Sequence, residues 1–325
     1  MIGMIAIVGC TREQAEEQAE AWRDCDTAFE ALEPPLAPAP SESIVPIDVG
    51  DPLPILRITA VPSDAETLAN RALATACVLT GGKVSATAEL PKWAEQAAED
   101  WYPNAGVFDD PSLEVETRPF ASVASSLEVY RKTEAVPRDG IGISAAQSSA
   151  EAVLDELVAR RLLPSREFLL AHVTEIQERE CSEAGCTHFV SGHTFWFQGQ
   201  VAGIPVRGLE AIIAVSSNGQ PRAISLTTTN VEVVSETTAA IEETAAEQRF
   251  LDLVQADYPN FEVFLDGPGE VTYLTPFEGG PTEVEPVWYA AWNVRSPAGT
   301  IGRPQPTSLS LTDADAPLVP YSPPE

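Results

Sequence analysis

The chain is poor in basic residues. Its 325 residues include 19 Lys+Arg against 49 Asp+Glu, for a formal net charge of −30, and lysine occurs only at Lys83, Lys92 and Lys132. A field of this sign repels nucleic-acid phosphates and anionic lipid headgroups. We therefore expect that nucleic acid is not a partner. A large net charge also opposes self-association, so the sequence predicts a monomer.

The side chains that most often perform catalysis are scarce as well. Histidine occurs only at His172, His188 and His193, all in segments with strand-like patterns, where a structural role is expected. Acidic residues are so common that carboxylate pairs indicate nothing about acid–base chemistry. Only Gly9 follows the first apolar run, whereas a nucleotide-binding loop needs several glycines. We predict a protein that is not an enzyme, with no cofactor and no resident metal.

Long apolar runs are also missing. No stretch reaches the roughly 18 apolar residues that a membrane-spanning helix needs. The sequence therefore predicts no helical membrane span, and any attachment to a membrane would require a lipid anchor.

The opening stretch, MIGMIAIVGCTREQAEEQ, either indicates nothing about the fold or has one of two interpretations. Met4–Val8, a turn at Gly9 and a helix capped by Thr11 would be the first strand and helix of a domain. Alternatively, residues 7–10 resemble a bacterial lipobox, in which Cys10 carries the lipid. An export signal has a basic start and roughly 7–15 apolar residues, and this stretch has neither. A start assigned too far downstream would account for both differences.

The residues that follow favour export. Residues 11–33 are acidic and helix-like, and residues 34–43, PPLAPAPSES, have the composition of an extended spacer. We therefore expect an extracytoplasmic protein of the bacterial cell envelope, lipid-anchored at Cys10, or a secreted one. The predicted organisation is a truncated lipoprotein signal (1–10), an acidic helix and proline-rich linker (11–43), an N-terminal α+β region (44–138), a second α+β domain (139–316) and a solvated tail (317–325).

The cysteines fit an oxidising compartment. If Cys10 carries a lipid, an even number remains, and such a compartment would pair these four. They are Cys25, Cys77, Cys181 and Cys186. Four cysteines allow three connectivities. Because Cys181 and Cys186 flank a short loop that contains a glycine, we predict a Cys181–Cys186 bridge, and with it a Cys25–Cys77 bridge.

The same segment has the ligand types of a zinc site, in the pattern C-x4-C-x-H-x4-H. Its members are Cys181, Cys186, His188 and His193. Alternating apolar residues over 187–197 indicate a strand, in which residues an odd number apart face opposite ways. His188 and His193 would then point away from each other, so we favour the disulfide. The same alternation places Phe195 and Phe197 in the core and Trp196 on the other face.

Helical periodicity is clearest in three segments. Residues 63–79 predict a helix capped by Ser63 or Asp64. Ser144-Ala-Ala-Gln147 has the pattern of a capping box, and a third helix is expected to begin at Ser235. The apolar face of the second helix would consist of Ala146, Ala150, Val153, Leu154 and Leu157, and that of the third of Ala246, Phe250, Leu253 and Val254.

Strand-like segments follow each of the last two helices. They are 168–176, 187–200, 209–215 and 222–227 after the first, and 261–265, 270–275, 287–295 and 308–311 after the second. Residues 83–90 also alternate. A helix followed by antiparallel strands, twice in the C-terminal half, predicts an α+β fold with helices packed on antiparallel sheets.

Residues 197–206, FQGQVAGIPV, are followed by an apolar strand and by SNGQ at 217–220. This arrangement resembles the propeptide region of thermolysin-like metalloproteases, which comprises a fungalysin/thermolysin propeptide segment and a PepSY segment. EVTYL at 270–274 and WYAAWNV at 288–294 are similar to the paired strands of PepSY. The resemblance covers roughly residues 140–316.

In that family the region assists folding of the protease and inhibits it. This chain contains no H-E-x-x-H run, the zinc site of the protease. The resemblance therefore implies a non-catalytic extracytoplasmic binding or inhibitory module, with a protease or another envelope protein as partner. It fixes no contact residue. A structural envelope lipoprotein, or a hydrolase with a site that the sequence does not reveal, remain alternatives.

Overall fold

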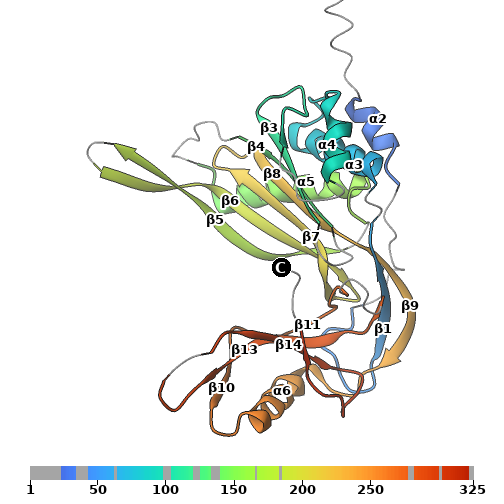
Figure 1. Ribbon diagram of the computed structural model, residues 1–325, viewed down its shortest axis with the longest axis vertical. Coiled ribbons are helices and arrows are strands. Elements are labelled where there is room, and N and C mark those ends of the chain that lie inside the picture. Colours follow the sequence, from blue (N-terminus) through green and yellow to red (C-terminus); the bar gives the residue numbers. More distant parts are fainter. Residues whose placement is uncertain are drawn as a thin grey trace, which may run out of the picture.

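The chain folds as helices packed on antiparallel sheets, which confirms the predicted α+β class (Figure 1). The computed structural model describes residues 23–33, 43–61, 64–97, 104–119, 125–132, 140–164, 167–182, 185–276, 282–299 and 302–321. The predicted anchor Cys10 lies outside these residues. Two hydrophobic cores organise the chain, one beneath the N-terminal helices and one beneath the C-terminal helix.

The largest sheet has seven antiparallel strands in the order β2-β3-β4-β8-β7-β6-β5. Its strands are β2 (Asn104–Ala105), β3 (Leu113–Pro119), β4 (Ser125–Arg131), β5 (Phe168–Ser182), β6 (Gly185–Val201), β7 (Ile204–Ser216) and β8 (Pro221–Thr228). Because β4 pairs with β8, the strands of region 44–138 and those of region 139–316 share one sheet.

Helices cover one face of this sheet. They are α2 (Cys25–Glu30), α3 (Ala65–Thr80), α4 (Glu89–Ala97) and α5 (Ile143–Ala159). The Asp64 carboxylate caps α3, as predicted, by accepting a bond from Thr67 N at 2.9 Å. Alternate residues of the strands, among them Phe195 and Phe197 of β6, are buried beneath the helices. This is the burial that the alternation predicted.

Helix α5 buries the predicted face, from Ala146 to Leu157. The predicted capping box is wrong. The helix begins at Ile143, with Gly142 as N-cap and no side-chain cap bond. The backbone N–H of Ile141 donates to Ser217 O at 2.7 Å, which fixes the chain just before this point, so the helix starts ahead of Ser144.

The C-terminal unit repeats the helix-then-strands order. Helix α6 (Glu243–Asp257) packs on a second antiparallel sheet. The ring of its Phe250 lies 4.9 Å from the ring of Trp288 in that sheet, measured between centroids. The strands of this sheet are β10 (Glu262–Leu265), β11 (Glu270–Thr272), β13 (Val287–Arg295), β14 (Gln305–Ser310) and β15 (Val319–Pro320). Within the stretch expected to be a solvated tail, 317–325, Val319–Pro320 form a strand and stay exposed.

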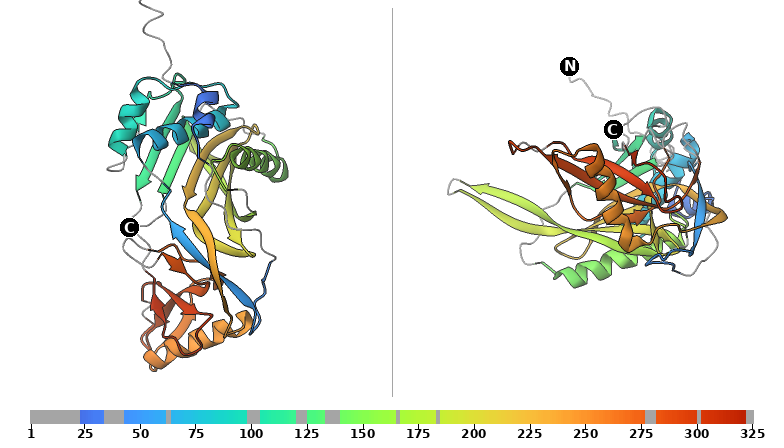
Figure 2. Two further views of the ribbon diagram at one scale, coloured as in Figure 1. Left: turned by 90° about the vertical axis from the view of Figure 1, so that its right-hand side faces the viewer. Right: turned by 90° about the horizontal axis from the view of Figure 1, so that it is seen from below.

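A third sheet joins the two units. Strand β1 (Pro52–Thr59) lies between β9 (Asn230–Thr238) and β12 (Glu283–Val284). Figure 2 shows β1 and β9 running side by side from the upper unit to the lower one. Only Thr229 separates β8 from β9, and its buried hydroxyl donates to Thr59 O at 2.9 Å.

Two further predictions are wrong. Ser235 does not begin a helix, because it pairs with Ile55 of β1 and lies within β9. Long-range pairing overrides its local helical pattern. The strand expected from the alternation of residues 83–90 is also absent. This segment forms only isolated bridges at Ala86, and helix α4 begins at Glu89, with Leu90 and Trp93 on its buried face.

Candidate binding surface

One face of the seven-stranded sheet is covered by helices α2 to α5. The opposite face carries an exposed tryptophan. A row of directly paired residues crosses four strands: His172, Trp196, Ile212 and Ser225. The Trp196 side chain is 41% exposed, and the His172 ring meets it edge-on with centroids 6.2 Å apart. The sequence predicted this outward position. Large aromatic side chains that stay accessible are typical anchors for protein partners.

Leu169 extends this surface towards the edge of the sheet. It is 53% exposed and pairs with Gln198, which lies two residues from Trp196 and so on the same face. We call the surface formed by Leu169, His172, Trp196, Ile212 and Ser225 the open face. It combines apolar and polar side chains on a rigid sheet.

Strands β5 and β6 continue beyond the sheet as a two-stranded ribbon. We call residues 177–182 and 185–190 the arm, which Figure 1 shows projecting from the body. Strand β7 ends at Ser216, opposite Gly192, so its pairing does not reach the arm. At that point a Cβ on Gly192 would lie 2.3 Å from Val215 O, so the close approach of the two strands requires glycine there.

The arm is held at its end and at its base. Cys181 and Cys186 face each other across the ribbon and form a disulfide, with their Cα atoms 4.0 Å apart. Near the base, the Arg222 guanidinium of β8 contacts the Glu178 carboxylate at 3.1 Å. An isolated two-stranded ribbon is marginally stable in water, so the bridge supports the order of the arm.

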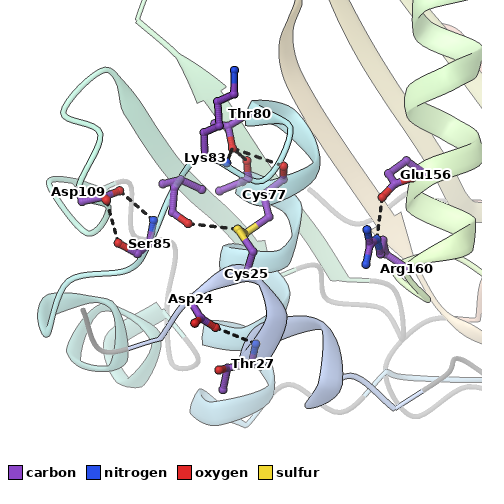
Figure 3. Close-up of a disulfide and its surroundings, with 12 residues drawn as sticks. Asp24, Cys25, Thr27, Cys77, Thr80, Lys83, Ser85, Asp109, Glu156 and Arg160 are labelled. Carbon is purple, nitrogen blue, oxygen red and sulfur yellow. Dashed lines mark hydrogen bonds and ion pairs between the residues drawn. A yellow bond between two sulfur atoms is a disulfide. The ribbon is translucent and has the colours of Figure 1, made fainter. Parts of the chain in front are cut away.

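The second disulfide, Cys25–Cys77, joins α2 to α3 (Figure 3). The Asp24 carboxylate accepts a bond from Thr27 N at 2.9 Å to cap α2, which lowers the pKa of Asp24. Both predicted pairs are therefore present. Two disulfides indicate a non-cytoplasmic compartment. Within the described residues, no helix is long and apolar enough to cross a membrane.

The structure does not support the zinc site considered for this segment, because the sulfur atoms of Cys181 and Cys186 are joined in a disulfide. His188 pairs with Arg179 in the arm, and His193 lies nearer the sheet, opposite Glu175. No group of three or more His, Cys, Asp or Glu in the described part of the chain could hold a metal ion.

A cluster at the junction of the two units was not predicted. We call it the junction cluster; its members are Arg207, Glu210, Glu270, Tyr289 and Tyr321. The Arg207 guanidinium of β7 lies 4.1 Å from the ring centre of Tyr289 and forms an ion pair with Glu270. Tyr321 meets the Tyr289 ring edge-on at 5.6 Å. These contacts connect the first sheet to the C-terminal sheet.

Burial raises the pKa of Glu210, opposed by the Arg207 charge and by a bond from the Gly208 N–H. The folded chain therefore holds this proton to a higher pH than the unfolded chain. The contribution of this carboxyl to stability falls as the pH rises through the raised pKa. Burial likewise raises the pKa of Tyr321. The residues of the junction cluster contact one another across two sheets. This arrangement holds the two sheets together.

A cavity of about 460 Å³ lies at the C-terminal end of α3. It is lined by Val78, Leu79, Thr80, Gly81, Lys83, Asp110, Arg131, Gln220 and Pro221. Bonds from the Ser112 hydroxyl and N–H, together with the Arg131 charge, lower the pKa of Asp110. The described lining holds two cations and one carboxylate, without a histidine, cysteine or serine.

No protein-family model matches the chain, and no curated protein matches it either.

The two disulfides are expected to differ in their response to reductant. Cys181 and Cys186 are exposed, whereas Cys25 is half-buried and Cys77, within α3, is 1% exposed. A thiolate must reach a sulfur atom to attack it, so mild dithiothreitol should open Cys181–Cys186 first. Alkylation followed by peptide mass spectrometry reports each pair. Cys25–Cys77 should become reactive only when denaturant is added, and equal rates in native buffer would contradict this prediction.

Proposed function

We propose that this protein is a non-catalytic, extracytoplasmic binding module of the propeptide type that presents its open face and arm to a partner protein. Its expected partner is a thermolysin-like metalloprotease of the cell envelope, which it would inhibit. The observation that carries the proposal is Trp196, held half-exposed on a sheet whose other face is packed under helices.

The architecture supports a surface that binds without rearranging. Trp196 is flanked by buried Phe195 and Phe197, which fix the backbone of β6 beneath it. It also pairs directly with His172 and Ile212 on the neighbouring strands. A side chain held in this way loses little conformational freedom on binding, which favours affinity.

The resemblance at 197–206 supports the choice of partner. FQGQVAGIPV runs from the end of β6 through the turn at 202–203 into β7. Its first residue, Phe197, follows Trp196 directly. The segment that resembles a protease propeptide is therefore continuous with the open face.

Inhibition of a thermolysin-like protease tests the proposal, with residual peptidase activity measured against increasing concentrations of the chain. The wild-type chain should inhibit in a saturable manner. Trp196→Ala should raise the concentration for half-inhibition by about 30-fold, the effect of losing an anchor of about 2 kcal/mol.

Phe261→Ala is the matched control, because Phe261 is similarly exposed, at 38%, but lies in the C-terminal unit. It should inhibit like the wild type. A panel of such proteases that all retain full activity would count against the inhibitory role. Inhibition that is unchanged in Trp196→Ala would show that the open face is not the contact.

A further inference from the structure

Strand β5 forms one end of the seven-stranded sheet. It is 15 residues long and pairs with β6 on one side, and no described strand pairs with its other side. Such an edge presents a row of backbone N–H and C=O groups that can bond to a further strand. This feature is distinct from the open face, because it lies in the plane of the sheet.

Proteins usually protect an edge of this kind with charged side chains, proline, β-bulges or a very short strand. The sequence of β5, FLLAHVTEIQERECS, has neither lysine nor proline. Its pairing with β6 is interrupted twice, after Leu170 and after Ile176. The charges it carries are mainly acidic, at Glu175, Glu178 and Glu180, with Arg179 among them.

The sign of this charge selects what can add to the edge. A second copy of the chain would bring the same glutamates and a net charge of −30, so self-pairing is opposed. An extended segment that carries lysine or arginine meets a complementary edge instead. We propose that the free edge of β5 binds an extended, basic segment of a partner protein by strand addition.

The open face defines the pattern of that segment. Side chains of an added strand alternate between the two faces of the sheet, so every second one would lie beside Leu169 and His172. Leu169 is exposed there and offers apolar contact. The expected ligand therefore places apolar side chains at alternate positions beside Leu169 and His172, and its basic side chains lie nearest the acidic half of β5.

Synthetic peptides test this inference directly. The probe is a ten-residue peptide that alternates valine and lysine, labelled for fluorescence anisotropy. Its matched controls replace lysine by glutamate, or carry N-methyl groups on alternate backbone amides. The basic peptide should bind at least about tenfold more tightly than the acidic one, because opposite charges favour the complex. N-methylation should abolish binding, because it removes the backbone donors.

Charge-reversal variants show where the peptide binds. Glu175→Lys combined with Glu180→Lys should invert the preference, so that the acidic peptide binds better. Glu236→Lys combined with Glu247→Lys makes the same change of charge at exposed positions on β9 and α6, and should leave the preference unchanged. Hydrogen exchange should show new protection in β5 when the basic peptide is bound.

Two outcomes would overturn the inference. One is binding that ignores the Glu175 and Glu180 reversal or survives N-methylation, since neither fits strand addition at this edge. The other is concentration-dependent protection of β5 without peptide, since this would make a second copy the occupant. Neither outcome affects the proposed function, which depends on Trp196. Loss of protease inhibition, in turn, would leave peptide binding at β5 unchanged.

Discussion

Replacement of both Cys25 and Cys77 by alanine is expected to lower the free energy of unfolding by about 4 kcal/mol. The bridge closes a loop with a sequence separation of 52, and the loss of loop-closure entropy from the unfolded chain gives this magnitude. It also fastens α2, only six residues long, to the buried helix α3. Denaturant unfolding under non-reducing conditions measures the change.

The second bridge provides the matched control for this prediction. Cys181 and Cys186 are separated by only five positions, so the same reasoning gives no more than about 2 kcal/mol for Cys181→Ala combined with Cys186→Ala. That variant should keep its core intact and lose order mainly in the arm. If the two double variants were equally destabilised, the loop-closure argument would fail for this protein.

Phe250→Ala is expected to lower the free energy of unfolding by about 3–5 kcal/mol. Phe250 of α6 is fully buried and packs against Trp288 of β13 and the neighbouring helical residue Val254. Its removal leaves a cavity between α6 and the C-terminal sheet, and the long strand β13 cannot move to fill it. Thermal and denaturant unfolding, followed by tryptophan fluorescence, report the loss.

Phe261→Ala serves as the comparison here too, because this ring is partly exposed at the end of the α6–β10 turn. Its effect should stay within about 1 kcal/mol. A small effect of Phe250→Ala would mean that α6 contributes little to holding the C-terminal unit together. That result would contradict the second core described above.

The sequence predicted the elements whose evidence is local. The α5 face from Ala146 to Leu157 follows from spacing of three and four residues, and the alternation around Trp196 follows from the period of a strand. The Cys181–Cys186 bridge follows from the short loop between the cysteines. In each case the residues that carry the signal lie within one element or one hairpin.

Features that depend on distant partners were missed. Ser235 has a helical neighbourhood, but it pairs with Ile55, which lies far back in the chain. The junction cluster unites β7, β11, β13 and the residues after β15, and no periodicity links these segments. The free edge of β5 is likewise a property of strand order, which depends on all the pairings in the sheet.

The continuity of β8 and β9 has a mechanical consequence. One extended stretch of chain leaves the middle of the first sheet and enters the C-terminal unit with the single buried residue Thr229 between. Because no loop separates the two strands, the chain cannot lengthen at this point. A displacement of the first sheet caused by a partner at the open face would therefore be passed along this stretch of backbone towards the C-terminal unit.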